Sequence, residues 1–96
     1  MTLTLSQQIK VSDDVLVQEV GGEAVLLNLA SQRYFGLDAI GTRIWALLGQ
    51  RTPLAGIVET IRSEYDVEPS RAEADLLALV GELRDMGLVE TVAEPS

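Results

Sequence analysis

Few side chains in this chain of 96 residues could do chemistry. The sequence contains neither histidine nor cysteine, so it lacks the commonest general base near neutral pH, the commonest metal ligand and any thiolate nucleophile. Its single lysine is Lys10, and Ser31 has no base near it in the sequence. Asp13 and Asp14 are adjacent carboxylates in a turn before a strand, where such pairs are usually solvated. We therefore expect no catalytic activity, no bound metal and no cofactor.

Length, composition and charge restrict the remaining classes. The length suits one domain, and 47% hydrophobic residues are enough to build one core. Seven basic against fifteen acidic residues give a net charge of -8, which repels phosphate backbones. No apolar run is long enough to span a bilayer, and the first residues do not resemble a signal peptide. We expect a cytoplasmic domain with neither a membrane nor a nucleic acid as its partner.

The first half of the chain has the pattern of strands. Segments 15–20, 24–29 and 33–36 are rich in β-forming residues, and Val25, Leu27 and Leu29 of the second segment share one face at a period of two. Gly21-Gly22 and Ser31-Gln32 separate them with tight-turn chemistry. The pattern predicts a three-stranded antiparallel sheet with 33–36 as a short strand at one edge.

The second half has the pattern of helices, predicted over about 39–48, 53–65 and 69–86. Asp38 and Thr52 are the expected N-caps of the first two, and Gly49 and Gly87 are expected to end the first and third. An apolar segment over 88–90 follows as a short strand or a packed extension. Three strands followed by three helices predict an α+β fold that is winged helix-turn-helix-like. We place the domain at 15–90, between an N-terminal arm over 1–14 and a tail over 91–96.

The third helix has a wider apolar surface than a simple core stripe requires. Leu77 and Val80 lie outside the main stripe and extend the apolar arc to roughly 180°. The main stripe itself consists of Ala72, Leu76, Leu79, Leu83 and Met86. One interpretation is that the small protein packs against this helix on two sides. The other is that one flank forms a groove with the edge strand, which suits an extended peptide.

Two other functions fit this order of elements. A winged-helix regulator would place its second or third helix in the major groove of DNA, but the third helix carries four carboxylates against two arginines. The acidic charge therefore disfavours DNA binding. A structural subunit could instead pair its edge strand with a second copy in a dimer.

Several ordered segments resemble the PqqD-like family. They are Ala-Val-Leu-Leu-Asn-Leu at 24–29, Arg-Tyr-Phe-Gly-Leu-Asp at 33–38 and Gly41-x-x-Ile44-Trp45. Segments 57–61, 65–67, 74–76 and 87–89 continue the similarity in the same order, over about residues 15–90. The second and third segments are most similar to the stand-alone recognition proteins of lasso-peptide biosynthesis.

The resemblance implies a non-catalytic adaptor that binds the leader of a ribosomally made precursor peptide. The leader would be an added strand between the third strand and the third helix, and it would be presented to a leader protease. Within the same family, the alternative partner is a radical SAM enzyme of cofactor synthesis or other peptide modification. The implied contacts are Arg33, Tyr34, Phe35 and Gly36 on the strand and Asp75, Leu76, Leu79, Val80 and Leu83 on the helix, with Asp75 meeting a basic leader side chain. The role of residues 1–14 stays open.

Overall fold

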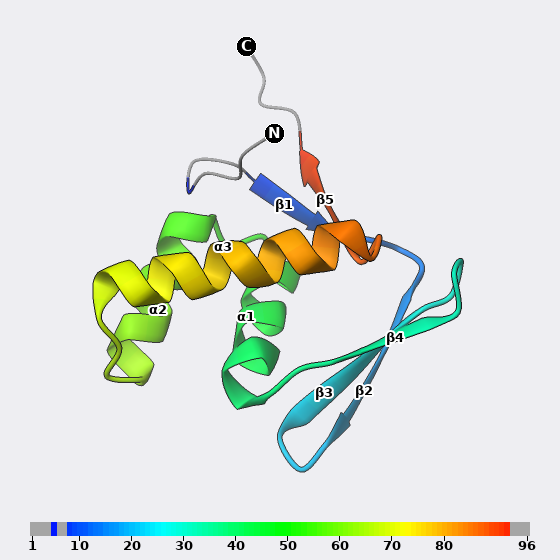
Figure 1. Cartoon of the computed structure of the whole chain (residues 1–96), viewed down its shortest axis with the longest axis horizontal. Coiled ribbons are helices and arrows are strands. Elements are labelled where there is room, and N and C mark those ends of the chain that lie inside the picture. Colours follow the sequence, from blue (N-terminus) through cyan, green and yellow to red (C-terminus); the bar gives the residue numbers. More distant parts are fainter. Residues whose placement is uncertain (1–4, 6–7, 93–96) are drawn as a thin grey trace.

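The fold is α+β, as the sequence predicted. The computed structural model describes residue 5 and residues 8–92, so parts of the expected arm and tail lie outside the described residues. In chain order the elements are β1 (Gln8–Val11), β2 (Val15–Val20), β3 (Glu23–Asn28), β4 (Arg33–Gly36), α1 (Ala39–Gly49), α2 (Leu54–Glu64), α3 (Pro69–Asp85) and β5 (Val89–Val92). Strands β2, β3 and β4 form one antiparallel sheet in that order, and its inner face lies toward the three helices (Figure 1). No helix in these described ranges is long and apolar enough to cross a membrane.

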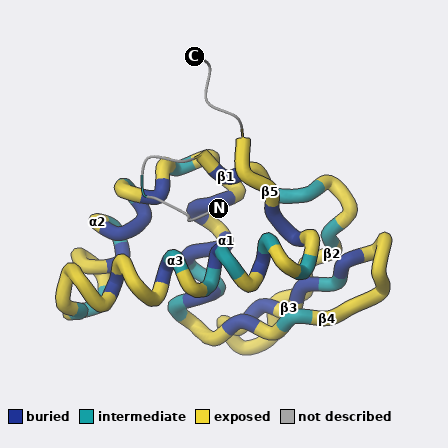
Figure 2. The backbone as a smooth tube through the Cα atoms, turned by 45° about the horizontal axis from the view of Figure 1, so that its top comes forward, coloured by how far each residue is buried: buried dark blue, intermediate teal, exposed yellow. Residues whose placement is uncertain are grey.

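The β2–β3 hairpin confirms the predicted glycine turn. Gly21 and Gly22 have φ angles of +62° and +84°, a left-handed conformation that glycine adopts without steric cost. The register places Leu26 of β3 between Val17 of β2 and Phe35 of β4, so these three side chains share the inner face of the sheet. Along β3, buried and more exposed positions alternate, as Figure 2 shows.

A second sheet joins the two ends of the chain. Strand β1 pairs with β5 in antiparallel register, from Gln8 opposite Val92 to Val11 opposite Val89. The Ile9 side chain is buried in the core, and the Ser12 N–H donates to the Leu88 carbonyl at 3.0 Å. Residues 8–11 of the expected arm are therefore part of the packed fold. The sequence could not assign this pairing because about eighty residues separate the two strands.

The start of α1 agrees with the predicted cap. The Asp38 carboxylate accepts the Gly41 N–H at 2.7 Å, which satisfies one of the free donors of the first turn. The predicted Thr52 cap of α2 is wrong. Pro53 occupies the N-cap position, with no side-chain hydrogen bond there, and the helix begins at Leu54.

The end of α1 differs from the prediction that Gly49 stops the helix. Gly49 lies within α1, and the left-handed residue is Arg51, with φ of +60°. The Arg51 N–H donates to the Leu48 carbonyl at 3.0 Å and the Thr52 N–H to the Leu47 carbonyl at 3.1 Å. These two bonds form a Schellman motif, so a non-glycine residue carries the conformational strain of the cap.

The end of α3 has the glycine cap that the sequence predicted. Gly87 has φ of +71°, and its N–H donates to the Arg84 carbonyl at 3.0 Å. The Leu88 N–H donates to the Leu83 carbonyl at 2.9 Å, and both leucine side chains are fully buried. This Schellman motif, with its apolar contact, directs the chain from α3 into β5.

Asn28 connects the sheet to the end of α3. It is the one buried polar side chain among the described residues, and its amide donates to the Met86 carbonyl at 2.7 Å. Its oxygen accepts from the N–H groups of Ala30 and Ser31 at 2.9 and 3.3 Å. A side chain on Gly87 would meet this amide at 3.0 Å, so glycine also gives Asn28 room. The β3–β4 turn is thereby held against α3.

The buried face of α3 is rotated relative to the predicted stripe. Its fully or nearly fully buried side chains are Ala72, Leu76, Val80 and Leu83. Leu79 and Met86, which were assigned to the core stripe, are only half-buried. Val80, which lies outside the predicted main stripe, is fully buried, because α2 and β5 pack against a different arc of the helix than the periodicity alone indicated.

Candidate functional site

Strand β4 has a free edge, because it is the last strand of the β2-β3-β4 order. The Leu37 N–H donates to the Ala24 carbonyl on β3 at 2.8 Å. In an antiparallel strand the backbone groups of successive residues point to opposite sides, so those of Phe35 and Arg33 also face β3. The N–H and C=O groups of Tyr34 and Gly36 therefore face away from β3. They are the groups available to an additional strand.

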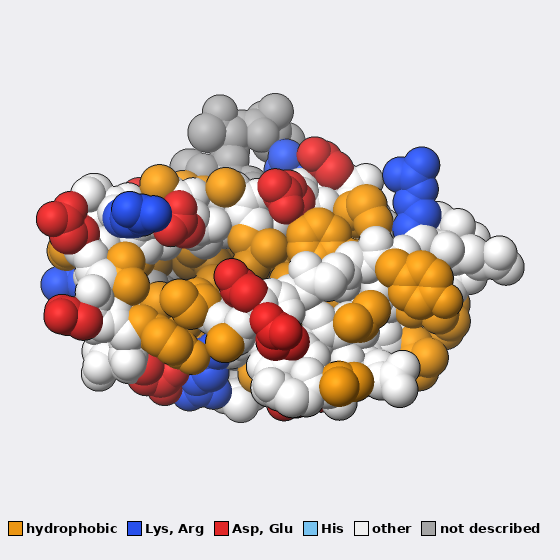
Figure 3. Space-filling model, turned by 60° about the horizontal axis from the view of Figure 1, so that its bottom comes forward, with side chains coloured by type: hydrophobic (Ala, Val, Ile, Leu, Met, Phe, Trp, Pro, Cys, Tyr) orange, Lys and Arg blue, Asp and Glu red, His pale blue; other side chains and the backbone are white. Residues whose placement is uncertain are grey.

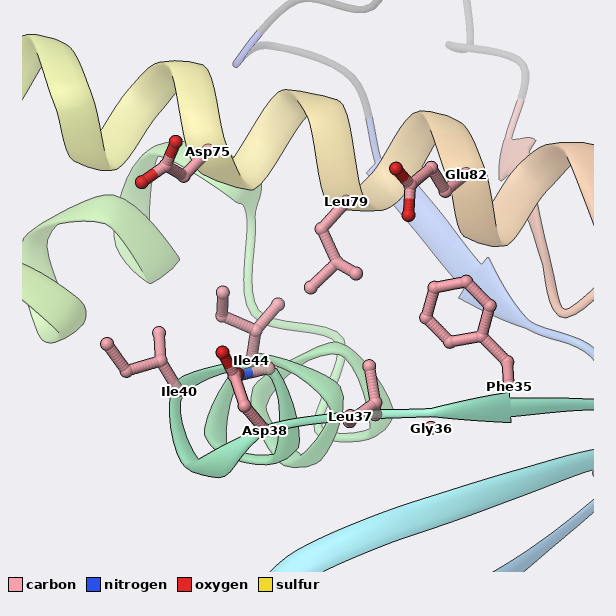
Figure 4. A pocket seen from close by; sticks show the side chains of 10 residues that line it. Phe35, Gly36, Leu37, Asp38, Ile40, Ile44, Asp75, Leu79 and Glu82 are labelled. Carbon is pink, nitrogen blue, oxygen red and sulfur yellow. The ribbon is translucent and has the colours of Figure 1, made fainter.

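A groove of about 440 Å³ runs beside this edge. One wall is formed by the end of β4 and the start of α1, and the other by α3, as Figure 4 shows. The lining residues are Phe35, Gly36, Leu37, Asp38, Ile40, Gly41, Ile44, Asp75, Leu79 and Glu82. The groove and the free edge of β4 thus lie together.

The groove has an apolar interior and an acidic rim. Phe35 and Ile40 lie across from Leu79, whose side chain points from α3 toward the space between the two walls (Figure 4). The charged lining residues are the carboxylates Asp38, Asp75 and Glu82. On this face of the molecule, hydrophobic side chains are gathered with acidic side chains among them (Figure 3). The site suits an extended apolar segment with positive charge beside it.

Four of the nine predicted contact residues line the groove: Phe35, Gly36, Asp75 and Leu79. Tyr34 has its backbone on the free edge, but its side chain is 70% exposed on the outer face of the sheet, opposite to that of Phe35. Arg33 lies at the start of β4, outside the groove lining. Binding by these residues stays a prediction, and for Tyr34 it concerns the backbone.

The other three predicted contacts, Leu76, Val80 and Leu83, are at most 1% exposed. They belong to the hydrophobic core and support the groove from beneath, so their side chains offer no surface to a ligand in this structure. Helical periodicity gave their shared apolar character but not which side of α3 the rest of the protein covers. Leu79 is the apolar side chain of α3 that lies in the groove.

Sequence reasoning missed the contribution of α1 to the groove. Ile40 and Ile44 were interpreted only as part of a core helix, Leu37 was given no role in the site, and Glu82 was counted only among the carboxylates of the third helix. The signal for Glu82 was present, because it lies three residues after Leu79 and thus on a neighbouring position of the helix surface. The contribution of α1 depends on where this helix sits relative to α3, which no local pattern shows.

The outer face of the sheet carries a second apolar surface. Its apolar side chains come from all three strands and the turn after β3: Leu16, Val20, Val25, Leu27, Leu29 and Tyr34. The register makes Leu16, Leu27 and Tyr34 one row across the sheet. At the outward positions of β2, β3 and β4, the one charged residue is Glu23. We call these six residues the outer face.

The described residues contain no group of three acidic, histidine or cysteine side chains that could hold a metal ion. The ion pairs near the groove are peripheral. Arg71 lies 3.7 Å from Asp75 on α3, and Arg43 of α1 forms two 2.9 Å hydrogen bonds with Glu64 of α2. The Arg43 guanidinium lowers the pKa of the Glu64 carboxyl through these hydrogen bonds, and Glu64 in turn raises the pKa of Arg43. This pair connects α1 to α2.

Comparison with known proteins agrees with this geometry. Residues 23–89 match the family described as Coenzyme PQQ synthesis protein D (PqqD). The chain belongs to the PqqD family. This confirms the resemblance described from the sequence. The matched PqqD region runs from the first residue of β3 to the first residue of β5, so it contains both walls of the groove.

Two solved structures have the same fold as this PqqD-family chain. TbiB1 in complex with the TbiA(beta) leader peptide is 40% identical, with a TM-score of 0.82, over 88% of this chain and 99% of that chain. Lasso peptide synthetase B1 complexed with the leader peptide is 28% identical, with a TM-score of 0.78, over 85% of this chain and 96% of that chain. No match was found among curated proteins.

Proposed function

We propose that this protein is a non-catalytic adaptor that binds the leader of a ribosomally made precursor peptide. The leader would pair with β4 as a fourth strand and fill the groove between β4 and α3. The adaptor would then present the bound precursor to a leader protease during lasso-peptide maturation in the cytoplasm. The observation that carries the proposal is the free backbone of Tyr34 and Gly36 beside the apolar groove.

Two arguments support a peptide rather than a small molecule as the ligand. A strand added to a sheet edge obtains its affinity from main-chain hydrogen bonds, and alternate side chains supply specificity by entering pockets. Here the groove lies on the side of β4 that such side chains would enter, across from Leu79. Both similar solved structures are complexes with a leader peptide.

Fluorescence anisotropy with labelled leader peptides tests this proposal. The probes are the leader encoded by a precursor gene beside this one and the TbiA(beta) leader peptide. We expect saturable binding at micromolar protein, and we expect Leu79→Glu to weaken it at least tenfold, because a carboxylate would enter the apolar interior of the groove. Ala78→Glu adds the same charge at an exposed position of α3 and serves as the control. The proposal is contradicted if neither leader shows saturable binding.

The Leu79 substitution is a sharper probe than a change at Leu76 or Val80. A glutamate at either of these positions would place a carboxylate in the core, where a charge without a partner costs several kcal/mol. Loss of binding there would report unfolding. Leu79 is half-buried and points into open space, so its replacement tests the groove itself.

The outer face is the proposed contact for the processing enzyme. A contiguous exposed apolar surface on a small protein of net charge -8 commonly marks a protein interface. This face lies on the same strand as the peptide edge, because the Tyr34 side chain points outward while the Tyr34 backbone faces the added strand. A leader bound to β4 would extend the sheet by one strand, so an enzyme on the outer face would lie beside it.

Charge substitutions separate the two surfaces. We expect Leu16→Asp and Leu29→Asp to slow leader cleavage by the protease encoded nearby while the Kd for the leader stays unchanged. Both residues are more than half exposed, so the fold should tolerate the change. Glu19→Gln, on the inner side of β2, is the control. Normal cleavage with both aspartate variants would refute this contact.

A protease and a radical SAM enzyme would need the leader presented in the same way, so leader binding alone does not distinguish these two partners. The enzymes encoded by the neighbouring genes do. Self-pairing through β4 is the competing use of the edge. Light scattering distinguishes the two, because a dimer formed through β4 must dissociate when the leader binds.

A further inference from the structure

The acidic rim of the groove has a defined spacing. Asp75, Leu79 and Glu82 lie on one side of α3, at four and three residues from one another, and all three line the groove (Figure 4). Along the helix axis, Asp75 precedes Leu79 by about 6 Å and Glu82 follows it by about 4.5 Å. An apolar contact thus lies between two carboxylates.

The three rim carboxylates differ in the hydrogen-bond donor or cation that lies beside each of them. One oxygen of Asp38 accepts the Gly41 N–H at 2.7 Å as the cap of α1. Asp75 has Arg71 at 3.7 Å, one turn earlier on the same helix. Glu82 has no cation within 4.0 Å among the residues that the structure describes. Glu82 is therefore the rim carboxylate with neither a cap hydrogen bond nor a cation beside it.

The periodicity of a strand matches this spacing. In a peptide paired with β4, side chains on one face recur every two residues, or about 6.8 Å. If one side chain enters the groove against Leu79, the next ones on that face lie about 6.8 Å away in both directions. Because β4 lies roughly along the axis of α3 (Figure 4), a strand paired with β4 would bring those positions close to Asp75 on one side and Glu82 on the other. The reach of a lysine or arginine side chain covers the remaining difference for Glu82.

We propose that Glu82 is a specificity-determining residue that selects a cation in the bound peptide, two positions from an apolar anchor against Leu79. The inference rests on the proposed function and adds a peptide pattern: cation, any residue, apolar residue, any residue, cation. Asp75 contributes at the other end, more weakly because Arg71 competes for its carboxylate. The groove thus binds basic amphipathic strands and discriminates against acidic ones, since like charges at the rim repel.

Selection from a displayed random-peptide library tests the pattern without knowledge of the natural leader. The baits are the full-length wild-type chain, Glu82→Lys and Glu73→Lys. Glu73 is an exposed carboxylate of α3 that does not line the groove, so its reversal changes net charge equally. We expect lysine or arginine two positions from an apolar anchor in peptides from the wild type and Glu73→Lys. We expect aspartate or glutamate at that position in peptides from Glu82→Lys.

A peptide from the wild-type selection then allows a double-mutant cycle by anisotropy. Glu82→Gln in the protein and lysine to glutamine in the peptide should each raise the Kd about two- to fivefold, and the second change should add little to the first. The inference is overturned if enriched peptides lack the cation, if Glu82→Lys selects the same peptides, or if the two changes are additive. Each of these results leaves peptide binding, and so the proposed function, intact. If none of the three baits enriches any peptide, both the inference and the proposed function are overturned.

Discussion

Gly36→Pro is the substitution that most directly tests strand addition at β4. Gly36 is the last residue of β4, and its N–H points to the free edge, away from β3. Proline removes this donor and is tolerated at the edge of a sheet, where no ladder hydrogen bond within the protein is lost. Gly36 is exposed, and a Cβ added to it meets nothing within 4 Å. We therefore expect the free protein to stay folded.

The expected loss of affinity has two parts. One missing hydrogen bond contributes about 0.5–1.5 kcal/mol, a factor of about two to twelve in Kd. In addition, the proline ring occupies the space between β4 and a strand that would lie about 4.8 Å away, so the strand cannot approach closely. Together these effects should raise the Kd for the leader at least tenfold.

The assay compares Gly36→Pro with Gly36→Ala by anisotropy, using the same leader probe. Alanine keeps the N–H and adds a Cβ in open space, so its Kd should stay within about twofold of the wild type. Circular dichroism and urea unfolding check that both variants are folded. If Gly36→Pro binds the leader as tightly as Gly36→Ala does, the peptide does not pair with β4 and the reasoning fails.

Three further predictions concern the frame that holds the groove. Asn28→Ala should lower the free energy of unfolding by about 1–3 kcal/mol in urea titrations, because the Met86 carbonyl loses its 2.7 Å donor; an unchanged midpoint would show that water replaces the amide without cost. Arg51→Gly should raise the free energy of unfolding by about 0.5–1 kcal/mol, and with it the urea midpoint, because glycine adopts φ of +60° without steric cost. A lower midpoint would mean that the arginine side chain compensates for the strain. The Arg43–Glu64 pair should stabilise the protein above the ordinary carboxyl pKa, and this contribution should be lost as pH falls through the lowered pKa of Glu64. Glu64→Gln should thus flatten the acid side of the stability profile, and an identical profile would contradict the pairing.

The order and type of the main elements could be derived from local patterns. Gly21-Gly22, Asp38 and Gly87 act within a few residues of themselves, so turn and cap chemistry located them correctly. The free edge at 33–36 followed from its shortness and from the helical sequence directly behind it. The exceptions were also local. Arg51 rather than Gly49 has the left-handed conformation, because a helix can end on a strained residue when the surrounding packing supports it.

Local sequence patterns could not identify contacts between residues that are distant in the chain. The pairing of β1 with β5 brings together residues from the two ends of the chain, and neither strand is distinctive enough to identify its partner. The packing of α2 and β5 against α3 decides which side of that helix is buried. Val80 lies in the core and Leu79 lies in the groove beside β4, whereas periodicity put Leu79 in the core stripe and Val80 outside it.

The amino-acid sequence by itself determined the α+β class, the absence of histidine and cysteine chemistry, the acidic charge and the short strand at 33–36. These properties depend on composition, or on neighbours a few residues apart. Only the tertiary structure decided which backbone groups of that strand are free, that α1 completes the groove, and that Glu82 lies on its rim. The reason is that a groove consists of two walls distant in sequence, and the core that positions them determines which side chains each wall exposes.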